Sequence, residues 1–370
     1  MTPILDLKVG IQQRVLPTYR APFFEMLAVS CSKGLAVFAG QPPAEDMVEQ
    51  AAGLKHALFF EAENHQSKIA GQVFFKQGGL IDWLENWQPD ILVIEANPRN
   101  RSIAAAVNWM HARKRKVVGW GLGIPVDSGP FSALRSQLRN RLLFQLDGVI
   151  TYSAAGADSY RRAGFPAEKV YVAPNAVAPR PTGPAPHRPA GLKNERATLL
   201  FVGRLQFRKK IDALLQACAE LPTAIQPELV IIGDGPARAE WQRLAETIYP
   251  QAKFIGALHG HALEPYFKKA DLFVLPGTGG LAIQQAMSFA LPVIVGEADG
   301  TQADLVRQDN GWVIDSMQPG ELSRILLLAL SDPARIRQMG NESYRIVHDE
   351  INLEKMVEAF LQALQSIGEV

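Results

Sequence analysis

The sequence has few cysteines, little net charge and no long apolar runs. Its two cysteines, Cys31 and Cys218, lie far apart in apolar surroundings, so we expect reduced core thiols and a reducing, cytoplasmic environment. No apolar run approaches the ~18 residues that a membrane-spanning helix needs. The N-terminal stretch MTPILDLKVG lacks a basic region before an apolar core, so no signal peptide is expected.

The net charge of +1 is unevenly distributed. Residues 1–178 hold 19 basic and 15 acidic side chains, whereas residues 179–370 hold 19 and 22. The basic excess includes the run Arg113–Lys116 and the set Arg135, Arg139 and Arg141. One interpretation is contact with an anionic membrane surface or an anionic acceptor. For Arg113–Lys116 we favour the alternative that these are ordinary cations near the C-terminus of a helix, where they interact favourably with the helix dipole. No strongly basic face with interleaved aromatics appears, so nucleic acid is not an expected partner.

The chain length and the order of its apolar segments predict two domains. Its 370 residues, 47% of them apolar, suffice for two α/β domains with sizeable cores. Strand-like runs alternate with helical stretches, which predicts parallel sheets covered on both faces. The Pro- and Gly-rich residues 179–196 predict an interdomain linker. We expect domains at 1–178 and 197–348, with a C-terminal helix within 349–370.

A glycine-rich turn lies at the centre of the second predicted domain. Residues 274–296, VLPGTGGLAIQQAMSFALPVIVG, predict a strand, a turn over 276–280, a helix from Leu281 and another strand. Glycines before a helix leave backbone N–H groups free and place no Cβ in the way, so the turn can hold a phosphate or a sugar hydroxyl. A tight turn of any α/β protein is the alternative.

A pair of basic residues precedes this turn in the sequence. In FVGRLQFRKKID, Gly203 ends a strand, Arg204 follows at once and Lys209 begins the next helix. A guanidinium fork and a point charge at one sheet edge suit a diphosphate, although two solvated surface cations would give the same spacing. Residues 233–236, GDGP, predict a turn that begins a helix and is primarily structural.

The order and spacing of these motifs resemble the GT-B glycosyltransferases, specifically the retaining glycosyltransferase family 4. The resemblance rests on FVGRLQFRKKIDALLQA, VIIGDGP, KFIGALHGHALEPYFKKADLFVLPG and GGLAIQQAMSFALPVIV, with weaker support from VAPNAV and LPTYRAPFF. It implies two Rossmann-like domains with parallel sheets that face each other across a cleft. The first would bind the acceptor and the second the nucleotide-sugar, and the C-terminal helix would cross back to the first domain.

The resemblance also implies roles for individual residues. Arg204 and Lys209 would be the catalytic pair, gripping the donor diphosphate and stabilising the leaving group. The implied donor-binding residues are Gly203, Gly277, Thr278, Gly279, Gly280, Leu281, Gln285 and His259. The acceptor-side candidates are Tyr19, Arg20, Glu95, Asn97 and Arg99, each with the alternative of a loop residue that bonds to backbone. No metal and no cofactor other than the donor substrate is implied, and no clustered Asp-x-Asp or His/Cys set is present.

The sequence departs from the family pattern at two places. Gly277 and Gln285 occupy the positions of the two Glu residues in the E-x7-E signature. Gln285 can still exchange hydrogen bonds with a ribose, but Gly277 cannot supply a charge that orients the transferred sugar. The loop near GWGLGIP offers no His, where family members often present one.

The expected function is sugar transfer. The nucleotide-diphosphate sugar would give its sugar to a glycan, lipid-linked or small-molecule acceptor, with retention and without metal, in cell-surface polysaccharide or glycoconjugate synthesis. One alternative is a catalytically impaired GT-B protein that binds nucleotide or glycan. A second is a sugar-nucleotide epimerase, whose catalytic carboxylates and His are not evident here. Peripheral contact with the inner face of the membrane is a further expectation.

Overall fold

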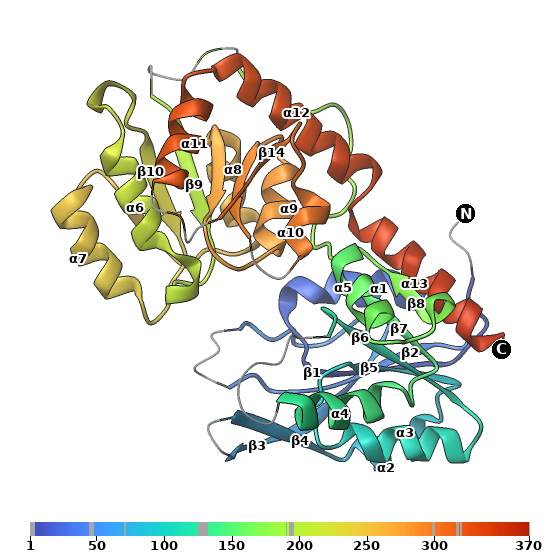
Figure 1. The fold of residues 1–370 in the computed structure, drawn as a ribbon. Helices are drawn as coiled ribbons and strands as arrows, with labels where there is room; N and C mark the ends of the chain where they lie inside the picture. Colours follow the sequence, from blue (N-terminus) through green and yellow to red (C-terminus); the bar gives the residue numbers. More distant parts are fainter. Residues whose placement is uncertain are drawn as a thin grey trace. The chain divides into compact units, whose positions relative to one another are not determined.

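A computed structural model describes residues 4–43, 48–69, 72–124, 132–189, 191, 196–297, 300–315, 318 and 320–369. The chain forms two compact units, each with its own sheet and core (Figure 1). Unit 1 consists of Met1–Val177 and Leu353–Val370, and unit 2 of Ala178–Asn352. Both are Rossmann-like, which confirms the predicted fold class.

Unit 1 is built on an eight-stranded sheet of order β4-β3-β2-β1-β5-β6-β7-β8. Its strands are β1 (Val9–Val15), β2 (Leu35–Gly40), β3 (Leu58–Ile69), β4 (Gln72–Gly78), β5 (Ile91–Glu95), β6 (Lys116–Gly121), β7 (Gly148–Thr151) and β8 (Val170–Val172). Its helices are α1 (Ala21–Val29), α2 (Leu80–Trp87), α3 (Ile103–Ala112), α4 (Ser132–Leu143), α5 (Ala154–Arg162) and α13 (Leu353–Gly368). All neighbouring strands are parallel except β3 and β4, which form an antiparallel hairpin.

The β3–β4 hairpin is a feature that the sequence pattern did not predict. Its residues are largely polar, so neither an apolar run nor a clean alternation marks both strands. The outer edge of β4 contacts the loop that follows β5: Phe75 N donates to Arg99 O at 3.0 Å and Arg101 N donates to Phe75 O at 2.9 Å. The hairpin therefore holds this loop at the carboxyl edge of the sheet.

Alternate residues of the unit 1 strands point to opposite faces and form two apolar cores. On one face, Ile91 and Val93 of β5 pack in a core with α1 and α13. On the other, Leu92 and Ile94 pack in a core with α2, α3 and α5. The C-terminal helix α13 contributes Phe360, whose ring lies 4.8 Å, centroid to centroid, from the rings of both Phe23 and Trp120. The last helix of the chain is thus part of the core of unit 1.

Unit 2 contains a six-stranded parallel sheet of order β11-β10-β9-β12-β13-β14. Its strands are β9 (Thr198–Val202), β10 (Glu228–Ile232), β11 (Lys253–Gly256), β12 (Leu272–Leu275), β13 (Val293–Gly296) and β14 (Gly311–Ile314). Its helices are α6 (Ile211–Glu220), α7 (Arg238–Ile248), α8 (Glu264–Lys269), α9 (Leu281–Met287), α10 (Thr301–Leu305), α11 (Glu321–Leu330) and α12 (Pro333–Asp349). The central strands β9, β12 and β13 are buried on both faces, as continuous apolar runs require.

The Pro-rich segment before β9 belongs to unit 2 and is bonded to its helices. Arg188 donates to Phe267 O and Phe289 O at 2.9 and 2.8 Å, and also to Ala270 O. Burial lowers the pKa of Arg188 to about 10. Arg337 of α12 donates to Pro189 O at 2.7 Å. These bonds fix the described part of the segment to unit 2.

Candidate active site

The candidate donor residues of unit 2 follow β9, β11 and β12, with Gly203 and Arg204 immediately after β9. Loops after neighbouring parallel strands meet at the carboxyl edge of the sheet, where ligands of this fold class bind. Gly203 N donates to Ile232 O at 3.0 Å and Leu205 N donates to Asp234 O at 2.9 Å, so the loop after β9 pairs with that after β10.

Glycines of the GDGP turn allow this pairing. A Cβ on Gly233 would lie 1.9 Å from Gly203 O, and one on Gly235 would lie 2.4 Å from Leu205 O. Both glycines also have positive φ angles, +145° and +156°. The turn thus places its backbone directly against the segment that carries Arg204.

Residues 276–280, here called the glycine loop, pack against the Arg208–Lys209 segment. A Cβ on Gly277 would lie 2.1 Å from Arg208 O and 2.6 Å from Lys209 Cα. Thr278 N donates to Arg208 O at 3.1 Å. Position 277 therefore has no room for a side chain in this structure, which gives a steric reason for the glycine there.

Two cations hold the glycine loop from its β9 side. Lys209 is 8% exposed, and its Nζ donates to Thr278 O. Arg208, which is exposed, donates from Nη1 to Thr278 Oγ1 at 2.6 Å. A Cβ on Gly279 would come within 2.6 Å of Lys209 Nζ. The ammonium group of Lys209 is therefore placed at the glycine loop, where an anionic ligand held by the loop would meet it.

A third side chain, from α10, holds the same loop. Gln302, 2% exposed, donates from Nε2 to Gly279 O at 2.6 Å. A Cβ on Gly280 would lie 3.0 Å from Thr301 Oγ1. The start of α10 thus packs against the glycine loop, and the carbonyl of Gly279 is bonded from the α10 side.

The remaining donor-side candidates differ in their surroundings. Leu281 begins α9, and Gln285 is half-buried one turn further along. Gln285 contributes its backbone carbonyl to Ser288 Oγ, 2.7 Å away. His259 is exposed and precedes the short helix after β11. Its neighbour His261 contacts Glu264 Oε1 at 2.6 Å.

In unit 1, Tyr19, Arg20 and Glu95 gather around Tyr152. Burial raises the pKa of Tyr152 to about 12, with Arg20 acting against the shift and Glu95 and Tyr19 adding to it. Arg20 is buried and donates to Asn175 Oδ1 at 2.8 Å. Burial also raises the pKa of Glu95, whose Oε1 accepts from Arg14 N at 2.8 Å. Charged and phenolic groups thus share this edge of the sheet.

Asn97 and Arg99 belong to the turn that follows β5. Asn97 Oδ1 accepts from Arg99 N at 3.1 Å, so this side chain shapes the turn. Arg99 is exposed, and its carbonyl accepts from Phe75 N. The loop in which the family pattern would place a His is described only as far as Ile124, so the rest of it lies outside the described residues.

Buried side-chain amides, which no sequence motif predicts, form a hydrogen-bonded network next to this edge. Gln77 of β4 is 2% exposed; its Nε2 donates to Gln13 O and to Asn64 Oδ1, both at 3.0 Å. Gln12 Nε2 donates to Gln77 Oε1, and Gln12 Oε1 accepts from Glu95 N at 3.2 Å. Isolated Gln and Asn residues in separate strands carry no motif. Only the β3–β4 hairpin, had it been predicted, could have indicated that they meet.

The two basic clusters have different environments. Arg113 is exposed and stacks on Trp109, 3.9 Å from the ring centroid. Arg139 is buried and donates to Ser136 Oγ at 3.3 Å, so it is not a surface cation. Among the described residues, no helix is both long and apolar enough to span a membrane. In the same residues, no three His, Cys, Asp or Glu side chains come together as a metal site.

Two Rossmann-like units are the architecture of the GT-B fold, and solved structures share this fold. Anabaena Alr3699/HepE in complex with UDP superposes with a TM-score of 0.72 at 15% identity, covering 97% of this chain and 99% of that one. Sucrose-phosphate synthase from Thermosynechococcus elongatus superposes with a TM-score of 0.70 at 18% identity, covering 97% and 98%.

Residues 185–346 match the model of the family described as Glycosyl transferases group 1, and residues 37–180 match that of Glycosyltransferase Family 4. The two matched regions are therefore glycosyltransferase domains, and the solved structures show that the chain has the GT-B fold.

GDP-mannose-dependent enzymes are among the curated relatives. The Corynebacterium glutamicum monoacylated α-(1-6)-phosphatidylinositol monomannoside mannosyltransferase is 28% identical over 194 residues, 49% of this chain and 50% of that protein. A Mycolicibacterium smegmatis α-mannosyltransferase is 39% identical over 109 residues, 29% and 27% of the two chains. The chain spans about half, or less, of the length of the curated relatives it matches.

Proposed function

We propose that this protein transfers a sugar from a nucleotide-diphosphate sugar to a glycan, lipid-linked or small-molecule acceptor. The observation that carries the proposal is the position of Lys209, whose ammonium group bonds to the glycine loop of unit 2. Arg204, in the paired loop after β9, supplies the second cation. The charge of a departing nucleoside diphosphate is what two such cations stabilise.

In this proposal the transfer proceeds with retention and without metal. Arg204 and Lys209 neutralise the charge that develops as the sugar–phosphate bond breaks. A donor phosphate oxygen takes the proton of the acceptor hydroxyl, so no protein nucleophile is needed. The acceptor contacts unit 1 near Tyr19, Arg20 and Glu95, where polar side chains share the carboxyl edge of the sheet.

The experiment is a panel of UDP-, GDP- and dTDP-sugars with nucleotide release as the readout, with and without candidate acceptors. GDP-mannose and UDP-sugars come first, because mannosyltransferases that use GDP-mannose are among the relatives and UDP is bound in a protein of the same fold. Acceptor-stimulated release of nucleotide supports transfer. No binding and no release across the panel would contradict it.

A second candidate, a binding protein without turnover, is favoured by one observation. Gly277 has no room for the carboxylate that family members carry there, and Gln285 replaces the second. The same panel separates the two candidates. Tight binding of a nucleotide-sugar, seen as a rise in the unfolding temperature, together with no release, would favour the binding protein.

A further inference from the structure

The chain passes between the units at two places, after Val177 and after Asn352. One side chain of unit 2 forms hydrogen bonds to the backbone near both crossings. Gln284 of α9 is fully buried. Its Oε1 accepts from Ala178 N at 2.8 Å, and its Nε2 donates to Ala178 O at 3.3 Å and to Ile351 O at 3.1 Å. Ala178 is the first residue of unit 2, and Ile351 is the last but one.

The main chain of Gln284 is tied to the candidate donor site. Its N–H donates to Gly280 O, the last residue of the glycine loop, at 3.3 Å. Its neighbour in sequence, Gln285, is a candidate donor-binding residue. Gln284 is therefore bonded to the glycine loop through its main chain and to Ala178 and Ile351 through its side chain.

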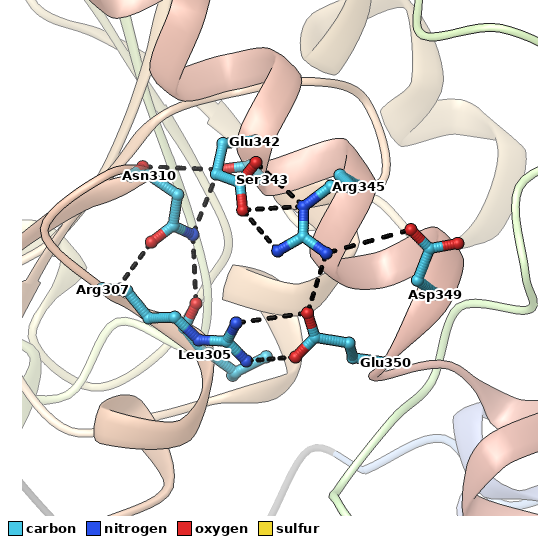
Figure 2. A network of polar contacts seen from close by, with 8 residues as sticks. All are labelled: Leu305, Arg307, Asn310, Glu342, Ser343, Arg345, Asp349 and Glu350. Carbon is cyan, nitrogen blue, oxygen red and sulfur yellow. Dashed lines mark hydrogen bonds and ion pairs between the residues drawn. The ribbon is translucent and has the colours of Figure 1, made fainter.

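The second crossing is also held by the residues on either side of Ile351, which are Glu350 and Asn352. Figure 2 shows that Glu350, the residue before Ile351, forms ion pairs with Arg307 and Arg345. Arg307 Nη1 donates to Glu350 Oε1 at 3.2 Å, and Arg345 Nη1 donates to the same atom at 3.0 Å. Asn352, fully buried, donates to Val347 O at 2.7 Å.

The ion pairs in Figure 2 fix the end of α12 to the loop before β14. Asn310 Oδ1 accepts from Arg307 N at 2.6 Å, and Asn310 Nδ2 donates to Leu305 O at 3.0 Å and to Ser343 Oγ at 3.3 Å. Ile351 N donates to Ile346 O of α12 at 2.9 Å, so the N–H of Ile351 is bonded to α12 and its carbonyl is left for a partner outside α12. Gln284 is the side chain bonded to that carbonyl.

We propose that Gln284 is a positioning residue that couples occupancy of the donor site to both segments joining the units. The inference rests on the proposed function, because the ligand that moves the glycine loop is a nucleoside diphosphate or its sugar. Binding at the loop fixes α9, and the amide of Gln284 then orders residues 176–180 and 349–353 together. A buried amide with several hydrogen bonds is suited to this coupling, because leaving its buried donor or acceptor unpaired costs free energy.

The test is hydrogen exchange, measured peptide by peptide on the full chain with and without UDP or GDP. In the unsubstituted protein, nucleotide slows exchange in the glycine loop and in both crossing segments. Gln284→Met conserves volume and removes the amide. In this variant nucleotide still protects the loop, but the protection added at the crossings falls about tenfold. Gln284→Leu is a second variant with the same expectation.

Gln226→Met is the matched control. Gln226 is a half-buried amide that donates to Ala219 O at 3.2 Å and Leu221 O at 3.1 Å, before β10 and at the amino edge of the sheet. It should lower stability without changing the response of the crossings.

The outcomes separate the inference from the proposed function. If neither nucleotide nor nucleotide-sugar protects the glycine loop, the proposed function fails and the inference fails with it. If the loop is protected but the crossings of the unsubstituted protein do not respond, only the inference fails. An unchanged response in Gln284→Met would also overturn it. If both variants fold poorly, a lack of response at the crossings of the unsubstituted protein still overturns the inference.

Discussion

The carboxyl edges of the two sheets are built by different means. In unit 2, the edge is made of backbone: glycines allow three loops to approach closely, and Lys209, Arg208 and Gln302 hold the loop after β12. In unit 1, it is made of side chains: Glu95, Tyr152 and Arg20 meet above a network of buried amides. The first arrangement suits a ligand whose charged group is always the same, whereas the second can be altered residue by residue.

Among the substitutions that test this comparison, the largest effect on turnover is expected at Lys209. Lys209→Met should cost about 2–4 kcal/mol of transition-state stabilisation in nucleotide-sugar turnover, because the leaving diphosphate loses a cation. The measurement is kcat/KM for nucleotide release. Lys269→Met is the control, since Lys269 is exposed and pairs with Glu228 at the first residue of β10. Equal turnover in both variants would contradict the role of Lys209.

The next effect tests whether unit 2 depends on its glycines. Gly277→Ala should destabilise the protein by about 2–3 kcal/mol, because the added Cβ would overlap Arg208 O. Gly277→Glu, which introduces the residue that the resemblance implies for this position, should destabilise at least as much and should not raise activity. Thermal unfolding and nucleotide release are the measurements. A stable Gly277→Glu variant with higher activity would show that the glycine loop rearranges.

A smaller effect is expected in unit 1. Gln77→Leu removes the hydrogen bonds that Gln77 makes to the buried carbonyl of Gln13 and to the side-chain amide of Gln12. This should lower the free energy of unfolding by about 1–2 kcal/mol. Stability should fall while nucleotide affinity in unit 2 stays the same. Gln66→Leu, an exposed position on the same hairpin, is the control. Weaker nucleotide binding in Gln77→Leu would mean that the two edges are not independent.

The smallest effect concerns pH and has opposite signs in the two units. The Arg307 bond lowers the pKa of Glu350, with a further contribution from Arg345. This stabilisation is present above the unfolded pKa and is lost as the pH falls through the folded one. Because Glu350 is about one-third exposed, the effect is below about 1 kcal/mol. Glu350→Gln should flatten the acid side of the stability curve, measured by denaturant unfolding.

For Glu95 the sign reverses, because burial raises its pKa. The charged form is disfavoured in the folded protein, so Glu95→Gln should increase stability above the folded pKa, and the difference should vanish as the pH falls below the unfolded pKa. Arg14 N retains an acceptor in this variant. If Glu95→Gln were destabilising at neutral pH, the carboxylate would be making favourable contacts that outweigh burial.

The same difference explains what could be predicted from the sequence. Strands such as Leu272–Leu275 and the glycine loop are local patterns, and the predicted fold class is confirmed. The β3–β4 hairpin was not predicted, because its residues follow neither period clearly. Gln77 and Tyr152 could not be identified, since their neighbours come from distant strands. The steric reason for glycine at position 277 is its contact with the backbone of Arg208, which the sequence does not reveal. The roles of Arg204, Lys209 and the acceptor-side residues stay predictions.

One consequence of α13 concerns the order in which the protein is made. The core of unit 1 contains Phe360, packed on Phe23 and Trp120, although more than two hundred residues of chain separate Trp120 from it. During synthesis the ribosome releases all of unit 2 before this helix emerges. Unit 2 can therefore finish folding first, while the N-terminal half waits with an exposed aromatic surface. Chaperone dependence should therefore be greatest for the part of the protein that is translated earliest.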